Sequence, residues 1–322
     1  MPKKKNKILI TGGAGFIGYH LANKLSKENK IDLIDNFSRG AVDNDFKLLL
    51  KNKNIKFFKI DLNKEIKIQV KNYDYIYHLA ATIGVDNVIS NPLKVLTNNY
   101  LSTINVINFA KKQKNLKRLL FTSTSEVYSG SAKHKLIKFP TNENNIISLN
   151  EIDSARGTYM LSKIYCEALC QFSKIPFIII RPHNIFGERM GMSHVIPELI
   201  KKIHSSNKYL KLNNSSHKRS FCYIEDAIEM IIRLMKNSKT KNKTFNLGDP
   251  KSEMSIIELA KKLLKLSNIN KKIRRINHQN FSVQRRLPDI KKILKAIDFK
   301  KKSTFDKNLK KTYEWYEKNL SI

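Results

Sequence analysis

T-G-G-A-G-F-I-G, residues 11–18, follows a short apolar run at residues 7–11 and opens a stretch of helical periodicity at residues 16–28. Its glycines permit a tight turn and let backbone N–H groups approach a pyrophosphate at the start of the helix. A lone match would be weak, because glycine-rich turns arise by chance, but strand, motif and helix stand here in the required order. The stretch predicts a dinucleotide-binding βαβ unit whose cofactor contacts include Gly12, Gly15, Phe16, Ile17 and Gly18.

An acidic residue, Asp35, ends the next apolar run at residues 31–35, twenty positions after Gly15. A carboxylate at this place accepts hydrogen bonds from the adenosine ribose and repels a 2′-phosphate. We therefore expect NAD rather than NADP as the cofactor. Arg39 lies close enough to oppose this preference.

Further apolar runs at residues 55–60, 74–80, 116–124 and 176–181 alternate with helical patterns at residues 92–112 and up to about residue 173. Strands separated by helices of this length predict an α/β fold with a Rossmann-like, doubly wound parallel sheet. After residue 182 short strands near 209–212, 219–223 and 244–247 mix with helices near 195–205, 225–236 and 255–266. We expect an NAD-binding domain over residues 1–182 and a smaller mixed α/β substrate lobe over residues 183–322, with a soft boundary and exchanged segments.

Tyr159 and Lys163 stand one helical turn apart in G-T-Y-M-L-S-K, residues 157–163. A free tyrosine has a pKa of about 10, which a nearby ammonium lowers by favouring the tyrosinate. The spacing alone is also typical of an ordinary helix surface. However, the preceding strand ends in T-S-T-S-E-V-Y, residues 122–128, and ligands of such sheets bind at the carboxyl ends of the strands. Thr124, Ser125 and Glu126 should therefore share a crevice with the pair, as proton removal from a secondary alcohol and hydride transfer to a nicotinamide require.

The composition bears on compartment and partners. The 322 residues are 41% hydrophobic, which suits a large globular core, and no apolar stretch approaches the roughly 18 residues of a membrane span. The basic start M-P-K-K-K-N-K is not expected to be a signal peptide, because only residues 8–10 behind it are apolar. Cys166, Cys170 and Cys222 are expected to be buried free thiols, so we expect a cytoplasmic protein without a metal site.

The net charge of +34 permits a polyanionic partner. The lysines are nevertheless scattered over the whole chain, and the abundance of lysine, asparagine and isoleucine fits AT-rich coding equally well. We therefore expect a solvated lysine-coated surface that attracts small anions, with neither nucleic acid nor a membrane as partner.

Motifs along nearly the whole chain resemble the extended short-chain dehydrogenase/reductases that act on nucleotide sugars. Beside residues 11–18 and the Tyr159–Lys163 pair, they are D-N at 35–36, D-L at 61–62, H-L-A-A at 78–81, N-N at 98–99, S-E-V-Y at 125–128, R-P-H-N at 181–184, V-I-P at 195–197, R-S-F-C-Y-I-E-D at 219–226, N-L-G at 246–248 and R-L-P-D at 286–289. The resemblance implies catalytic roles for Thr124, Ser125, Glu126, Tyr159 and Lys163. It implies cofactor contacts at Asp35, Asn36, Asp61, Leu62, Ala80, Ala81 and Asn98, and nucleotide-sugar contacts at Asn184, Val195, Arg219, Arg286 and Asp289.

The subclass follows from smaller differences. Thr124-Ser125-Glu126 stands where the 4,6-dehydratases of this family show Thr-Asp-Glu, and together with residues 91–99 and 246–259 it resembles the UDP-glucuronate decarboxylases. Oxidation at C4 would place a ketone β to the C6 carboxylate, with Glu126 handling protons and Arg286 meeting the carboxylate. Gly187-Glu188 and Ser193-His194 depart from the decarboxylase pattern, and a UDP-sugar 4-epimerase shares the remaining motifs. A non-catalytic RNA-binding or NAD-sensing protein on the same fold is the alternative from another class, and the intact Tyr159–Lys163 pair speaks against it.

The resemblance also implies a homodimer, in which helices near residues 98–112 and 159–173 pair across a two-fold axis. We expect the apolar side chains there to exceed what the sheet needs, namely Ile104, Ile107, Phe109, Leu161, Ile164 and Leu169. Other features have plain structural interpretations beside the functional ones. Glu126 could be a structural hydrogen-bond acceptor, His194 a packing residue, and Trp315 and Tyr316 part of the core, while residues 129–156 form either a lid over the sugar or an irregular connection.

Overall fold

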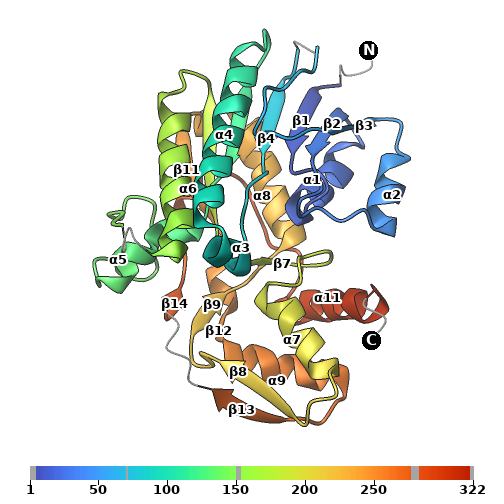
Figure 1. Ribbon diagram of the computed structural model, residues 1–322, viewed down its shortest axis with the longest axis vertical. Helices are drawn as coiled ribbons and strands as arrows, with labels where there is room; N and C mark the ends of the chain where they lie inside the picture. Colours follow the sequence, from blue (N-terminus) through green and yellow to red (C-terminus); the bar gives the residue numbers. More distant parts are fainter. Residues whose placement is uncertain (1–4, 70–71, 150–153, 277–282, 320–322) are drawn as a thin grey trace.

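A parallel sheet with helices on both faces forms the larger part of the computed structural model, and a smaller lobe lies below it (Figure 1). The structure describes residues 5–69, 72–149, 154–276 and 283–319. The sheet has the strand order β11-β6-β5-β4-β1-β2-β3, and all its pairings are parallel. Its strands are β1 (Lys7–Thr11), β2 (Lys30–Asp35), β3 (Ile55–Lys59), β4 (Tyr75–His78), β5 (Arg118–Thr122), β6 (Phe177–Pro182) and β11 (Lys243–Leu247).

Helices cover both faces of this sheet, which is why its strands are continuous apolar runs rather than alternating ones. In β1, Ile8 and Ile10 pack into the cluster under α1 (Phe16–Leu25) and α8 (Ile224–Lys236), whereas Leu9 packs into the cluster under α4 (Pro92–Lys111) and α6 (Ala155–Phe172). The helices of this part are α1 (Phe16–Leu25), α2 (Asn44–Leu50), α3 (Val85–Ser90), α4 (Pro92–Lys111), α5 (Ser129–Lys133), α6 (Ala155–Phe172) and α8 (Ile224–Lys236). The predicted fold class is therefore confirmed.

The smaller lobe is built from short strands and three helices of the described chain. Its helices are α7 (Val195–His204), α9 (Ile256–Ser267) and α11 (Phe305–Asn319), whereas α10 (Lys291–Ala296) packs against β11 and α8 of the larger part. Its strands are β7 (Ile185–Phe186), β8 (Tyr209–Asn213), β9 (Lys218–Ser220), β10 (Cys222–Tyr223), β12 (Glu253–Ser255), β13 (Lys272–Ile276) and β14 (Arg285–Arg286). Single 3₁₀ turns lie at Ser125–Tyr128, Ser238–Thr240 and Pro250–Ser252. A capping box begins α9, where Ser255 and Glu258 satisfy each other's backbone amides, as the sequence S-I-I-E favours.

Segments that follow residue 182 take part in both halves. β11 pairs with β6 as the outermost strand of the main sheet, and α8 packs against α1. α10 in turn packs against β11 and α8, so a division of the chain near residue 182 has to assign β11, α8 and α10 to the larger half. The periodicity of residues 244–247 predicted a strand but could not tell which sheet it joins.

Some expected surfaces are core instead. Ile107 and Phe109, which were expected to be available for a partner, are 1% and 4% exposed and belong to the cluster under the sheet, so this expectation was wrong. Leu169 also packs partly against that cluster. The three cysteines are buried free thiols, as expected. Of the polar stretch 129–156, the first residues form α5, and residues 150–153 lie outside the described part of the chain. Among the described residues, no helix is both long and apolar enough to cross a membrane.

Candidate active site

The glycine-rich turn between β1 and α1 leaves space for a phosphate group. Gly12 has a φ of +72°, and a Cβ there would lie 2.8 Å from the backbone nitrogen of Ala80. A Cβ at Gly18 would lie 2.1 Å from the carbonyl oxygen of Gly12, so only glycine lets α1 approach the turn this closely. Because Gly15 is the N-cap of α1 and has no side chain, the first amides of the helix can face an anion. These residues fit the pyrophosphate of a dinucleotide.

Asp35 ends β2 beside this turn. Its Oδ2 accepts a hydrogen bond from the Ala14 amide at 3.0 Å and its Oδ1 one from the Phe37 amide at 2.8 Å. Each oxygen keeps a further lone pair that a ribose hydroxyl can use. Burial raises the pKa of the Asp35 carboxyl, and the backbone hydrogen bonds partly offset that rise. Arg39 lines the same cleft and reaches toward the turn at Gly191 on its far side.

A cleft of about 960 Å³ runs along the carboxyl ends of the strands between the two halves. It brings together most of the residues predicted for the site. These are Gly12, Gly15, Phe16, Ile17, Gly18, Asp35, Ala80, Ala81, Thr124, Ser125, Glu126, Tyr159, Lys163, Asn184, Val195, Arg219 and Arg286.

Five predicted residues do not line this cleft. Asp289 turns its carboxylate to the Lys291 amide, 2.8 Å away, at the start of α10. The Asn36 side chain accepts from the Ser38 amide, and that of Asp61 accepts from the Asn63 amide. The remaining two lie beside Asp61: Leu62 is buried in the core, and the Asn98 side chain accepts from that of Asn63 at 3.1 Å. The contacts of Asp289 with the nucleotide sugar, and of the other four residues with the cofactor, remain predictions.

Tyr159 and Lys163 lie on the face of α6 that meets the cleft. Lys163 is 3% exposed, donates from Nζ to the carbonyl oxygen of Thr122 at 2.8 Å, and lies over the rings of Phe121 and Tyr159. Burial lowers the pKa of the Lys163 ammonium to about 8. The pair is therefore not part of an ordinary helix surface.

The pKa of the half-buried Tyr159 phenol differs from the sequence-based expectation. Burial raises this pKa above its usual value, and the charge of Glu126 raises it further, whereas a hydrogen bond with Thr124 and the charge of Arg39 lower it. Lys163 holds its ammonium on the Thr122 carbonyl, 6.0 Å from the centre of the tyrosine ring. The protein groups alone thus do not bring the phenol toward ionisation at neutral pH.

Glu126 lies in the 3₁₀ turn that follows β5, and the side chain of Thr124 caps this turn. Its Oε2 accepts hydrogen bonds from Ser129 Oγ at 2.8 Å and from Arg286 Nη2 at 2.7 Å. Arg286 comes from β14, far along the chain, so the pair closes the cleft between the two halves. The carboxylate of Glu126 is also close enough to Tyr159 to act on its pKa.

Two arginines of the smaller lobe lie side by side in the cleft. Arg219 of β9 and Arg286 of β14 are Cα partners in a parallel pairing, so their side chains point to the same face. Their neighbours Lys218 and Arg285 point to the other face, where Arg285 pairs with Glu253. Two adjacent guanidinium groups suit a diphosphate, because their planar donors match its oxygens.

Sequence reasoning missed several residues that line the cleft. The largest set is the turn at residues 187–194, of which 189–194 line the cleft. His217 also lines it, and its Nδ1 is buried without a hydrogen-bond partner among the described residues. Trp315 and Tyr316 of α11 line it as well, although Tyr316 is core, as expected. The short spacing between His217 and Arg219 was a usable signal, whereas nothing in the pattern of α11 distinguishes a pocket wall from a core helix.

Comparisons with known proteins agree with this site. A UDP-N-acetyl-alpha-D-glucosaminuronate decarboxylase of Bacillus cytotoxicus is 29% identical, over 97% of this chain and 98% of the relative. UDP-glucuronic acid decarboxylase 1 of Danio rerio is 30% identical, over 99% of this chain and 74% of the relative. The fold is similar to that of the UDP-glucuronic acid 4-epimerase of Bacillus cereus, with a TM-score of 0.86, 24% identity, and 97% and 99% of the two chains covered. A model of the NAD dependent epimerase/dehydratase family matches residues 8–248. The chain therefore belongs to the NAD dependent epimerase/dehydratase family, as its motifs indicated.

Proposed function

We propose that this NAD-dependent enzyme decarboxylates a UDP-linked uronic sugar after transient oxidation at C4. The observation that supports this most directly is the Glu126–Arg286 pair beside Tyr159, which puts a proton-transfer group and a carboxylate-binding cation in one place. Relatives that match nearly the whole chain are decarboxylases of UDP-linked uronic sugars, which supports the same substrate class.

Tyr159 is the proposed base that takes the proton of the C4 hydroxyl. When bound, NAD supplies the acceptor for the C4 hydride, and its positively charged ring favours the tyrosinate. Within the protein, Thr124 and Arg39 act on the phenol in the same direction. Lys163 keeps a positive charge at neutral pH close to the Tyr159 ring and orients that ring from within α6.

Arg286 is the proposed partner of the C6 carboxylate. Oxidation at C4 makes the sugar a β-keto acid, whose C5–C6 electron pair moves toward the C4 carbonyl as carbon dioxide leaves. Glu126 is placed to pass a proton from solvent to C5, because it shares the cleft with Tyr159 and is held by Ser129 and Arg286. Arg219, which points to the same face as Arg286, would hold the diphosphate end, with Asn184 and Val195 further along the same wall.

A UDP-sugar 4-epimerase is the second candidate. Arg286 is already engaged by Glu126 at 2.7 Å, so a sugar carboxylate has to compete with an internal one for the same guanidinium. A sugar without a carboxylate would not compete with Glu126 for Arg286. Epimerisation would require only that the 4-keto sugar turn over in the cleft before the hydride returns to C4.

Incubation of the NAD-loaded protein with UDP-, GDP- and dTDP-sugars, followed by mass and NMR analysis, tests the proposal. We expect UDP-glucuronate or a close uronate to lose one carbon dioxide. Inversion at C4 without a mass change would establish the epimerase instead, and loss of one water a dehydratase. Tyr159→Phe protein is the control for background reaction, and no conversion of any nucleotide sugar would refute the proposed class.

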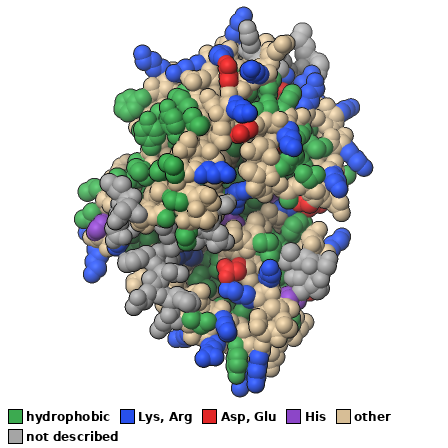
Figure 2. Space-filling view, viewed as in Figure 1, with side chains coloured by type: hydrophobic (Ala, Val, Ile, Leu, Met, Phe, Trp, Pro, Cys, Tyr) green, Lys and Arg blue, Asp and Glu red, His purple; other side chains and the backbone are tan. Residues whose placement is uncertain are grey.

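We also propose a homodimer that pairs α4 and α6. Figure 2 shows apolar side chains gathered over these helices, in the upper left of the view. Tyr100 of α4 and Tyr165 of α6 are 39% and 51% exposed, with ring centres 5.7 Å apart, and Leu93 and Phe172 extend the exposed patch. These side chains, rather than Ile107 and Phe109, are the proposed contacts, because a patch of this kind typically marks a protein interface.

A further inference from the structure

The turn at residues 187–194 forms one wall of the cleft in a backbone shape that needs support. Arg189 has a φ of +63°, in the left-handed region that costs a non-glycine residue about 1 kcal/mol. Gly187 has a φ of +156°, and a Cβ there would lie 2.4 Å from the Ile224 side chain. Such conformations persist only where surrounding contacts determine them. The contacts that hold this turn therefore set the shape of the cleft wall.

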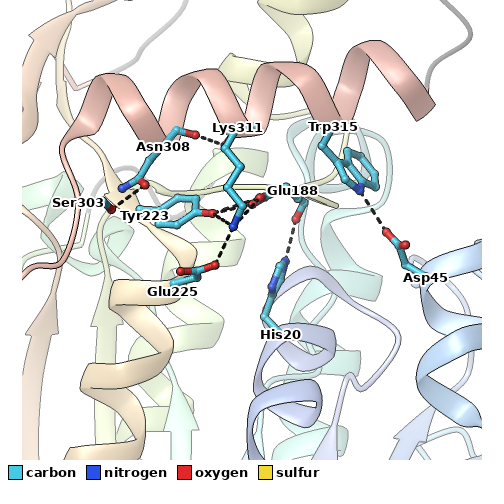
Figure 3. Close-up of polar contacts among 10 residues, drawn as sticks. His20, Asp45, Glu188, Tyr223, Glu225, Ser303, Asn308, Lys311 and Trp315 are labelled. Atoms are coloured by element: carbon cyan, nitrogen blue, oxygen red, sulfur yellow. Dashed lines mark hydrogen bonds and ion pairs between the residues drawn. The ribbon is translucent and has the colours of Figure 1, made fainter. Parts of the chain in front are cut away.

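Glu188 supplies the first set of contacts, although it does not itself line the cleft. Its carboxylate is buried and accepts a hydrogen bond from the Tyr223 hydroxyl, whose oxygen lies 3.1 Å from each carboxylate oxygen. Lys311 Nζ lies 3.3 Å from Oε1 of the same carboxylate. The ring of His20 in α1 binds the backbone oxygen of Glu188 at 2.9 Å. Figure 3 shows Lys311 reaching down from α11 to lie between Glu188, Tyr223 and Glu225.

Lys311 stays charged in this setting. Burial lowers its pKa, but hydrogen bonds with Glu225 and Tyr223 and the charge of Glu188 outweigh burial, and the net effect raises the pKa. Glu188 thus has a permanent cation beside it. Removing that cation would leave a buried carboxylate with one hydroxyl donor, a state that favours movement of the group toward water.

Neighbouring residues tie the same turn to both halves of the molecule. Arg189 Nε pairs with Asp43 Oδ2 at 2.8 Å, ahead of α2, and its guanidinium stacks over Tyr19 of α1. On the other side Tyr316 of α11 donates a hydrogen bond to the Met190 carbonyl. The turn therefore bridges the cofactor half and the C-terminal helix.

We propose that Glu188 and Lys311 are positioning residues: through this ion pair the C-terminal helix holds the 187–194 turn in the shape that binds the nucleotide sugar. This inference rests on the proposed function for its ligand. Helix α11 keeps its own apolar anchors, Leu309, Tyr313 and Tyr316, which are buried in the core. Loss of the pair should therefore release the turn without undocking the helix.

Lys311→Met and Glu188→Gln are the test variants. Lys310→Met is the matched control, because Lys310 is one residue away on the same helix and pairs with Glu314, whose side chain is 57% exposed, whereas the Glu188 side chain beside Lys311 is 12% exposed. We expect UDP to bind the two test variants about tenfold more weakly, a size typical of coupled contacts, while NAD affinity and Lys310→Met stay near wild type. The double variant should be no weaker than either single one, and Lys311→Arg should restore binding. With a substrate in hand, the loss should fall on KM rather than kcat.

Hydrogen exchange of the amides in residues 188–194 provides a readout that needs no substrate. We expect it to speed up about tenfold in Lys311→Met and Glu188→Gln but not in Lys310→Met. Unchanged exchange in the test variants would overturn the inference, and so would equal losses of UDP binding, NAD binding and thermal stability, which mark a merely structural pair. Wild-type protein that ignores UDP would refute the proposed ligand, and the exchange rates would then decide the inference alone.

Discussion

Lys163→Met should make the cofactor-free protein more stable at neutral pH, although Lys163 is a proposed catalytic residue. Lys163 is 3% exposed, and its ammonium lies 4.9 Å from the centre of the Phe121 ring. Its one hydrogen-bond acceptor among the contacts described is the Thr122 carbonyl, at 2.8 Å. Methionine has a similar unbranched shape and fills such a site without a charge.

The size of the effect follows from the pKa of the ammonium, which burial lowers from 10.5 to about 8. At about 1.4 kcal/mol per pKa unit, holding the charge inside the protein costs about 3 kcal/mol. The variant also loses the hydrogen bond to Thr122, which costs about 1 kcal/mol, so the net stabilisation should be about 2 kcal/mol. Because the folded pKa is the lower one, the cost is complete below pH 8 and disappears as the pH rises toward 10.5.

Urea unfolding of the cofactor-free protein at pH 7 and at pH 10 measures this difference. The variant should be more stable than wild type at pH 7, and the gap should close or reverse at pH 10. Lys261→Met is the control, since Lys261 is an exposed lysine on α9. A Lys163→Met protein that is less stable at pH 7, or a gap that does not change with pH, would show that the burial argument is wrong.

Four further changes have defined outcomes. Tyr159→Phe should still bind NAD but lose turnover by at least about 10²-fold, so a rate near wild type would exclude it as the base. Asp35→Ala should narrow the preference for NAD over NADP in comparative titrations, because it removes both the ribose contacts and the repulsion of a 2′-phosphate. Burial lowers the pKa of His78 and of His183 to about 3, so both stay neutral in the folded protein while they become charged in the unfolded chain below pH 6.5. The free energy of unfolding should therefore be about 2 kcal/mol lower per histidine at pH 5 than above pH 6.5. In His183→Asn protein, acid-unfolding curves should show a smaller fall. Tyr165→Asp should convert the proposed dimer to a monomer in light scattering, and a wild-type monomer at micromolar concentration would count against the proposed dimer itself.

The sequence predicted the parallel sheet because each of its first six strands is a short apolar run bounded by turns or helices. The structure places them within a few residues of the expected limits, from β1 at Lys7–Thr11 to β6 at Phe177–Pro182. Strands β13 and β14 were not predicted, since one is largely exposed and the other has two residues. Such strands form because they pair with strands that are distant in the chain, and a local sequence pattern does not reveal those partners.

The functional site likewise has a part that the sequence predicts and a part that it does not. Motif residues on β1, β5 and α6 meet in the cleft because the carboxyl ends of parallel strands share one edge. The wall at residues 187–194 could not be predicted, because its left-handed Arg189 is held by Asp43, Tyr19 and α11, which are distant in the chain. Glu188 appeared in the sequence only as a departure from a motif, and its burial against Tyr223 and Lys311 explains how the turn accommodates it.

The electrostatics of the Tyr159–Lys163 pair separate an active site from a stable helix packing. In the protein by itself the buried ammonium costs stability, and the phenol, whose pKa is raised, resists the ionisation that a base needs. A surface helix would have neither, because water would solvate both groups. Natural sequences retain destabilising groups of this kind mainly where function needs them, and perturbed pKa values accordingly cluster at catalytic sites. A cationic cofactor ring beside the phenol would lower its pKa toward the working range, so that proton removal at C4 becomes possible only once the cofactor is in place.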